Sequence, residues 1–372
     1  MGVIRSLTVG EDPYQRGLAH GEAFKADVAS NLETYIARFE ASGLTRSAAM
    51  DVADSWADAI ARQNGEYAEE MRGIADGSGH SLPAIALLNA RYEVAFSLFG
   101  KDARAKEKAF EEADGCTTFG VLGHVSADGH TWLGQNWDWL AGILGHNLVL
   151  RVKRKERPSF VCLTEAGIVG GKMGVNSVGI GLVENGLASS HDGKYGYAKP
   201  FHVRCREILD ADRFDDALRP VLESPRCSSG NFVVGSADGG GEIIDFETSP
   251  EAVTPIHPVD GVVSHSNHFV TPGHGRSEME RIAPSTLFRA SRIRRQIETR
   301  RDRLDMAAFT EAMCDHFNAP NAICRHPDER LPAAKRTMTT AAVLIDLDAR
   351  ILHVANGPPC SNPFVAFPLD AD

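Results

Sequence analysis

The sequence predicts an α+β protein in which antiparallel sheets are covered by helices. Three apolar, strand-like stretches double back at turn signals, which are Asp128-Gly129, Asp238-Gly239-Gly240 and Asp348-Ala349-Arg350. Apolar residues at helical spacing fill the intervening segments 201–211, 214–224 and 286–301. Hairpins followed by helices are typical of a layered α+β fold. No tandem repeat and no low-complexity linker divides the 372 residues, so we expect one compact domain.

The chain up to residue 115 is predicted to be mostly helical. Apolar residues recur at helical spacing over residues 14–42 and 47–63. A third helix is expected over residues 81–99, with a serine N-cap and a proline in its first turn. Because that helix is strongly apolar, its charged residues Arg91 and Glu93 are expected to pair with each other or with neighbours. A charged run at 101–113 is predicted to be helical as well.

The composition is that of an ordinary globular protein, with 43% apolar and 24% charged residues. The net charge of -11 argues against nucleic acid or an anionic membrane as the main partner. Two local basic runs, residues 151–157 and 289–303, are interpreted as a hairpin end and as the solvated face of a helix.

The seven cysteines argue against a disulfide framework and against a zinc site, because their number is odd and no CxxC occurs. Free thiols favour a reducing compartment. The N-terminal residues lack the apolar region of a secretory signal, and no window approaches the length of a membrane span. We therefore expect a cytoplasmic protein with no metal and no other cofactor.

The most informative stretch is residues 114–118, where a Gly-Cys bond joins a solvated segment to a buried strand. Gly115 has no Cβ, so its carbonyl is open to attack by the Cys116 side chain. Cleavage would leave an α-amine beside the thiol, and their ordinary pKa values, about 7.7–8.0 and about 8.5, allow proton exchange near neutral pH. The alternative is a cysteine that is merely packed at the start of a strand.

A second segment, residues 134–139, ends the strand expected to pair with the strand after Cys116. A short hairpin returns the chain to its starting point, so Asp138 is expected within reach of Cys116. Its carboxylate could hold an ammonium group or orient the nucleophile. The alternative is an aspartate that caps a turn, with the neighbouring aromatic residues in the core.

Two further polar residues stand at strand or loop ends. Asn267 follows an apolar strand and could donate to an oxyanion, or simply cap a turn. Arg325 precedes a proline-terminated turn and could clamp a carboxylate, or lie on the surface. His265 and His268 are only a weak metal signal, because no carboxylate partner is evident.

Three common functional signatures are absent. The glycine-rich stretch 167–181 has neither Walker spacing nor the pattern of a dinucleotide-binding loop, and its glycines are interpreted as bulges and close packing. No G-x-S-x-G nucleophile elbow occurs, so an ordinary serine hydrolase is not supported.

Taken together, these segments resemble the penicillin acyltransferase family of N-terminal-nucleophile (Ntn) hydrolases. The resemblance rests on short motifs in matching order, from residue 14 to residue 357: Arg16 to Glu22, Leu88 to Glu93, Gly115-Cys116-Thr117, Gly134 to Asp138, Thr164 to Ile168 with Asn176-Ser177, Asn267-His268 and Ile323-Cys324-Arg325.

This resemblance implies a four-layer αββα sandwich with two stacked antiparallel sheets. It also implies a precursor that cuts itself before Cys116, giving an α-fragment 1–115 and a β-fragment 116–372 that remain together as one domain. Cys116 would be the nucleophile and its new α-amine the base. Asp138 would position the amine or the substrate, Asn267 would stabilise the oxyanion, and Arg325 would support the polar network. Substrate contacts are expected from the flanking residues Thr117, Asn136, Trp137 and Trp139.

The expected activity is hydrolysis of linear N-acyl amides, such as N-acyl amino acids or acylated amines, through a thioester acyl-enzyme. Water resolves such an intermediate by default. The alternative is an N-acyltransferase that uses a coenzyme A thioester as donor, and a more remote one is an inactive binding scaffold. The expected partners are a small-molecule substrate and the cleaved fragment; a homo-oligomer stays open.

Overall fold

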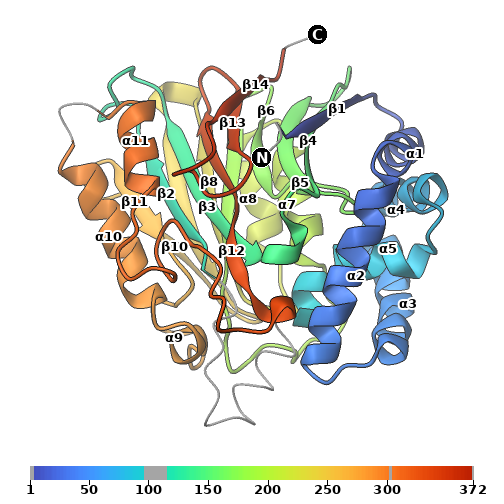
Figure 1. The fold of residues 1–372 in the computed structure, drawn as a ribbon. Coiled ribbons are helices and arrows are strands. Elements are labelled where there is room, and N and C mark those ends of the chain that lie inside the picture. Colours follow the sequence, from blue (N-terminus) through green and yellow to red (C-terminus); the bar gives the residue numbers. More distant parts are fainter. Residues whose placement is uncertain (1–3, 96–114, 301–303, 371–372) are drawn as a thin grey trace.

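Two β-sheets stacked face to face form the centre of the molecule (Figure 1). The computed structural model of the chain describes residues 4–95, 115–300 and 304–370. The predicted helix 101–113 and the end of the predicted helix 81–99 lie outside the described residues. Among the helices that the structure describes, none combines the length and the apolar character needed to cross a membrane.

The first sheet has eight strands, in the order β1 (Arg5–Val9), β4 (Asn147–Val152), β5 (Phe160–Glu165), β6 (Met173–Asn176), β7 (Ile180–Gly186), β8 (Gly230–Ser236), β9 (Glu242–Thr248) and β10 (Val253–Ile256). The second has six, in the order β11 (Val262–His265), β2 (Thr117–Val121), β3 (Trp132–Leu140), β12 (Thr337–Asp346), β13 (Ile351–Ala355) and β14 (Val365–Pro368). Pairing is antiparallel except between β1 and β4. All three predicted hairpins are present, as β2–β3, β8–β9 and β12–β13.

Helices cover the outer face of each sheet. On the six-stranded sheet lie α10 (Thr286–Glu298) and α11 (Met306–Met313), after the single turn α9 (Met279–Ile282). On the eight-stranded sheet lie α7 (Phe201–Leu209) and α8 (Phe214–Leu222). The layers therefore run helix, sheet, sheet, helix, and the expected αββα sandwich is confirmed. The basic run 151–157 lies at the β4–β5 hairpin end, as predicted.

The N-terminal segment forms a separate bundle at one side of the sandwich, on the right of Figure 1. Its helices are α1 (Pro13–Ala23), α2 (Lys25–Ala41), α3 (Arg46–Gln63), α4 (Gly65–Ser78) and α5 (Leu82–Asn89), and residues 91–95 continue in helical conformation. Ser81 caps α5 as predicted, its hydroxyl accepting from the amide of Ala84. The bundle is tied to the sheets by buried side chains: Arg91 pairs with Glu165, and Glu93 accepts from the amide of Phe201 at 2.7 Å.

Glycines bring α1 and α4 into close contact. A Cβ on Gly17 would lie 2.0 Å from the carbonyl oxygen of Glu70, and one on Gly73 would lie 2.2 Å from that of Tyr14. Beside this contact, the buried Arg16 donates to Glu70 at 2.8 Å. The Arg16-Gly17 pair therefore lets the two helices approach and supplies a buried ion pair across their interface.

Candidate active site

Cys116 lies directly before β2, and its side chain is only 3% exposed. The β2–β3 hairpin pairs Thr117 with Asn136, which brings Asp138 beside the start of β2. The thiol donates to the backbone oxygen of Asp138 at 3.5 Å. The hairpin thus places Cys116 and Asp138 together, with the thiol bonded to the main chain of that residue.

Strand alternation sends successive side chains of this segment to opposite sides. Thr117 faces α10, where its hydroxyl accepts from Arg289 at 3.0 Å. Thr118 faces the eight-stranded sheet, where Asn185 on β7 donates to its hydroxyl at 2.7 Å. Cys116, one residue before Thr117, belongs to the core packed between the two sheets.

The Asp138 carboxylate is held by two groups from other elements. Arg325 Nε lies 3.2 Å from Oδ2, and the hydroxyl of Thr339 on β12 donates to Oδ1 at 2.6 Å. The same hydroxyl accepts from the backbone amide of Arg325 at 2.9 Å. The β3–β12 register shifts between Thr339 and Ala341, so an irregularity in β12 sits at this contact.

Arg325 is buried, and its guanidinium is bound on all sides. Beyond Asp138, it donates to Asn321 at 2.9 Å and to the hydroxyls of Thr337 and Ser285, both at 3.3 Å. It also packs against Gly115, where a Cβ would lie 2.2 Å from Nε. A side chain larger than glycine at position 115 would therefore displace the guanidinium.

A second buried guanidinium, that of Arg289 on α10, contacts the peptide on both sides of Cys116. Nη1 donates to the carbonyl oxygen of Gly115 at 2.5 Å and also to that of Cys116. Nη2 donates to Oδ1 of Asn267 at 2.7 Å. Arg289 therefore links the Gly115–Cys116 peptide bond to the Asn267 side chain through hydrogen bonds.

The basic run 289–303 was predicted to be a solvated helix face, and for Arg289 this is wrong. The buried positions of α10 are Thr286, Arg289, Ile293 and Ile297, spaced as one helix face. An arginine in the apolar stripe of a helix must find buried partners. That spacing was present in the sequence and could have identified Arg289.

Asn267 follows β11 and is fully buried. Its backbone amide donates to the hydroxyl of Thr286 at 2.7 Å, and its side-chain Nδ2 donates to the carbonyl of Gly186, at the end of β7, at 3.0 Å. An amide nitrogen carries two hydrogens, so the bond to Gly186 leaves a second donor. Asn267 is therefore fixed in orientation by contacts with α10 and β7.

The four residues expected to contact substrate lie in different surroundings. Thr117 joins the Arg289 network. Asn136 points toward the loop after α11, and its Nδ2 donates to the carbonyls of Met313 and Ile323 at 2.9 and 2.8 Å. Trp137 and Trp139 are buried in the core, as expected if Asp138 caps a turn and its aromatic neighbours pack inside. Asn136 therefore binds β3 to the segment after α11, and the two tryptophans pack in the core.

A buried charge cluster adjoins the two tryptophans. Lys172 lies 2.9 Å from Glu165, and its Nζ stands 3.0 Å from the centre of the Trp137 ring. Trp139 Nε1 donates to the hydroxyl of Tyr35 at 2.7 Å. Burial lowers the pKa of Lys172 to about 8, although the Glu165 carboxylate opposes that shift.

The two histidines near Asn267 are engaged with other partners. His265 Nε2 lies 3.0 Å from Glu247, and His268 Nδ1 lies 3.0 Å from the hydroxyl of Thr286. Burial alone would lower the pKa of His265, but the carboxylates of Asp245 and Glu247 prevail and raise it to about 9. The described residues do not gather His265 and His268 into a group of metal ligands.

A pocket of about 420 Å³ adjoins the far side of Arg325. Asn321 and Thr337, which both bind the Arg325 guanidinium, are among its lining residues, with Pro284, Asp328 and Leu331. A larger pocket of about 750 Å³ lies near the first residue of β7, between Ile180 and the turn at Asp238. Gly186, which binds Asn267, is at the other end of that strand. The smaller pocket is the one that borders the Cys116 network.

Comparison with known proteins identifies the family. The family described as acyl-coenzyme A:6-aminopenicillanic acid acyl-transferase matches residues 125–359, which is more than half of the chain. The chain belongs to this family. The acyl-transferase family includes a relative from Emericella nidulans, the "acyl-coenzyme A:6-aminopenicillanic-acid-acyltransferase 40 kDa form". It is 26% identical over 365 residues, covering 97% of this chain and 94% of the relative.

Two solved structures of Ntn hydrolases have lower sequence identity to this chain than the fungal relative has. An N-acylethanolamine-hydrolyzing acid amidase orthologue from Caenorhabditis elegans has 13% identity and a TM-score of 0.46, covering 62% of this chain and 93% of the other. Penicillin V acylase from Agrobacterium tumefaciens has 12% identity and a TM-score of 0.48, covering 68% and 86%. These values carry no information on substrate.

Proposed function

We propose that the chain is a self-processing amidohydrolase that uses Cys116 as an N-terminal nucleophile on linear N-acyl amides. The observation that carries the proposal is the double contact on Gly115: Arg289 donates to its carbonyl oxygen, and Arg325 packs against its Cα side. A carbonyl that already accepts from a guanidinium is prepared for the negative charge that nucleophilic attack creates.

In the processing step, the Cys116 thiolate attacks the carbonyl carbon of Gly115. The new S–C bond replaces the backbone C–N bond, and the nitrogen takes up a proton to become the free α-amine of Cys116. Water then cleaves the thioester, leaving a carboxylate on Gly115 and a thiol on Cys116. Arg289 stabilises the oxyanion of each tetrahedral intermediate, because its Nη1 lies 2.5 Å from the oxygen that gains the charge.

In turnover, the α-amine of Cys116 accepts the thiol proton and the thiolate attacks the substrate carbonyl. The second N–H of Asn267 donates to the oxyanion, while Gly186 and Arg289 hold that amide in place. The amine leaves with a proton, an acyl thioester remains on Cys116, and water releases the acid. Asp138 and Arg325 act by positioning, since each holds the other beside the nucleophile.

An acyl-coenzyme A-dependent N-acyltransferase is the second candidate, favoured by the family description and by the printed name of the fungal relative. Here the thiolate would attack a coenzyme A thioester, release free coenzyme A, and pass the acyl group to an amine. Release of coenzyme A that depends on an amine acceptor would favour transfer. Hydrolysis of an N-acyl amide without coenzyme A would favour the hydrolase.

The decisive experiment is the denatured mass of freshly purified protein, with N-terminal sequencing. We expect two fragments, the larger beginning Cys116-Thr117-Thr118. Cys116→Ala should remain a single chain and lack turnover, whereas Cys314→Ser, which removes a thiol outside the network, should process normally. A single uncut wild-type chain, or full activity in Cys116→Ala, would contradict the proposal and favour a binding scaffold.

A further inference from the structure

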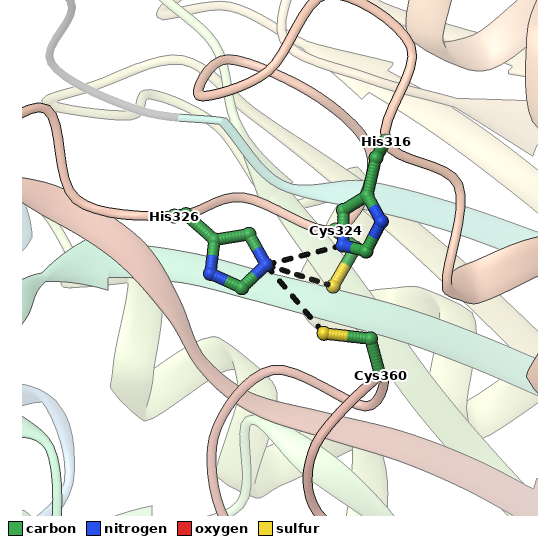
Figure 2. A group of neighbouring side chains, drawn as sticks. All are labelled: His316, Cys324, His326 and Cys360. Atoms are coloured by element: carbon green, nitrogen blue, oxygen red, sulfur yellow. Dashed lines mark hydrogen bonds between the residues drawn. The ribbon is translucent and has the colours of Figure 1, made fainter.

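A group of four potential metal ligands lies beside Arg325, and three of the four belong to the loop that carries it. His316, Cys324 and His326 belong to the segment between α11 and β12, and Cys360 belongs to the turn between β13 and β14 (Figure 2). One ligand atom from each side chain lies within 4.8 Å of all the others. The sequence argued against a zinc site because the cysteines are odd in number and no CxxC occurs, whereas the fold brings these four residues together from separate segments.

Three of the ligand atoms surround a single nitrogen. His326 Nε2 lies 3.1 Å from Nε2 of His316, 3.5 Å from Sγ of Cys360 and 3.9 Å from Sγ of Cys324 (Figure 2). An imidazole nitrogen has either one hydrogen or one lone pair, so it forms one good hydrogen bond and not three. Hydrogen bonding alone therefore does not account for this convergence.

The three spacings that meet at His326 Nε2 are close to the edges of a tetrahedron around one ion. Zinc binds imidazole nitrogen at about 2.0–2.1 Å and thiolate sulfur at about 2.3 Å. For tetrahedral angles these bonds set N···N at about 3.3 Å and N···S at about 3.5 Å. The observed 3.1 Å, 3.5 Å and 3.9 Å lie close to those edges.

We propose that His316, Cys324, His326 and Cys360 form a tetrahedral Cys₂His₂ site for Zn²⁺. Two thiolates and two imidazoles are the donor set that selects zinc over the hard cations. Four protein ligands complete the coordination shell, so the site is structural and leaves no position for a substrate. Cys116 is not among the ligands, so the assignment of the metal site does not rest on the function proposed above.

The ion would fix the loop that presents Arg325. Cys324 and His326 flank Arg325 directly, and the carbonyl of Ile323 accepts from Asn136 on β3. The segment from Asp315 to Pro332 contains no helix or strand, so its geometry depends on side-chain ties. A metal clamp between this segment and the β13–β14 turn would hold Arg325 against Asp138.

The test measures metal rather than activity. Wild-type protein purified without chelator should contain about one zinc per chain. Cobalt added to the chelated protein should give the visible bands of tetrahedral Co²⁺ and a sulfur-to-cobalt charge-transfer band. Cys360→Ser should weaken that charge-transfer band by about half, because one of two thiolates is lost. His316→Ala, which removes an exposed ligand and so should fold normally, should lower zinc affinity at least about tenfold.

Two control variants each remove a cysteine or a histidine that is not one of the four proposed ligands. Cys314→Ser removes a neighbouring thiol outside the four, and His130→Ala removes a histidine that instead pairs with Asp346 at 2.9 Å. Both should keep their zinc. The proposal is wrong if stoichiometric cobalt produces no thiolate band, if His316→Ala and Cys360→Ser bind metal as the wild type does, or if native protein contains a Cys324–Cys360 disulfide.

Discussion

Arg289 and Arg325 each contact Gly115 from a different element, and both donate to the hydroxyl of Ser285 at 3.3 Å. Among the described residues, their partners include carbonyl and hydroxyl oxygens, and the carboxylate of Asp138 pairs with Arg325. Burying two such cations is costly unless each donor is satisfied. A site that stabilises a developing oxyanion needs positive charge already in place, which gives this desolvation cost a functional reason.

Gly115→Ala tests the contact with Arg325. The added Cβ would lie 2.2 Å from Nε, so the guanidinium must move away from the scissile peptide and from Asp138. We expect the fragment beginning at Cys116 to appear about 100-fold more slowly, the loss typical of catalytic groups misplaced by about 1 Å. Intact mass over time measures the rate. Gly196→Ala, at a glycine with open space around it, is the matched control, and equal processing rates in the two variants would contradict the prediction.

Glu93 provides a prediction about pH. Burial raises the pKa of its carboxyl to about 7, and its Oε2 has no hydrogen-bond partner among the described residues. A carboxyl whose pKa is higher in the folded than in the unfolded state stabilises the fold at low pH. That contribution is lost as the pH rises from about 4.5 through about 7.

Glu93→Gln should therefore unfold at the same temperature as wild type near pH 5 and at a higher temperature near pH 8. The neutral amide avoids the buried charge while still accepting from the amide of Phe201. Thermal melts across this pH range measure the difference. Glu156→Gln, at an exposed turn position, should show no such trend, and a pH-independent gap between Glu93→Gln and wild type would refute the assignment.

Strand β12 contributes the hydroxyls of Thr337 and Thr339 to the site, and that of Thr339 is the one bonded to Asp138. Thr339 donates to Asp138 and accepts from the amide of Arg325, so it links the carboxylate to the loop. Thr339→Val keeps the shape but leaves both partners without this bond. We expect a loss of about 1–3 kcal/mol in the free energy of unfolding, together with slower processing.

The neighbouring Thr340→Val is the matched control, because that hydroxyl donates to the carbonyl of Trp137, at 3.2 Å, instead of to the Asp138 carboxylate. Denaturant melts measure the stability, and intact mass measures the processing. If Thr340→Val slows processing as much as Thr339→Val does, the effect belongs to β12 in general and not to the bond with Asp138.

Sequence reasoning worked best where the signal was local. The Asp-Gly turn at 128–129 predicted the β2–β3 hairpin, and that hairpin places Asp138 beside Cys116. It missed β1, because five residues at a sheet edge carry little apolar periodicity. Substrate contact by Trp137 and Trp139 stays a prediction; the structure shows both side chains buried in the core.

Residues of the long loops could not be placed from sequence. Arg325 was recognised through its Ile-Cys-Arg motif, but its bonds to Asn321, Thr337 and Ser285 depend on how the loop closes. The approach of Cys360 to His326 depends on two loops that are far apart in sequence. Such contacts arise from tertiary packing, for which spacing along the chain carries no signal.

The main hydrophobic core of the molecule contains residues from both sides of the proposed cleavage point. The largest apolar cluster contains residues from α2–α5 together with residues from both sheets, and Ala19 of α1 packs against it. Strand β1 pairs with β4, Tyr92 donates to the carbonyl of Ser229 at 2.8 Å, and Asn89 donates to that of Gly167 at 2.9 Å. The α-fragment 1–115 therefore supplies part of the core that the β-fragment would otherwise expose.

We accordingly expect the two fragments to remain associated after cleavage. Buried apolar surface and buried ion pairs such as Arg91–Glu165 are insensitive to salt screening, so 1 M salt should not separate them. Size-exclusion chromatography of the cleaved protein should give one peak with the mass of the full chain or of an oligomer of it. Denaturing electrophoresis of that peak should give two bands. Elution of a separate, folded β-fragment under native conditions would contradict this expectation, because the 116–372 segment would then have to bury its β4 edge and its contacts to α5 without the α-fragment.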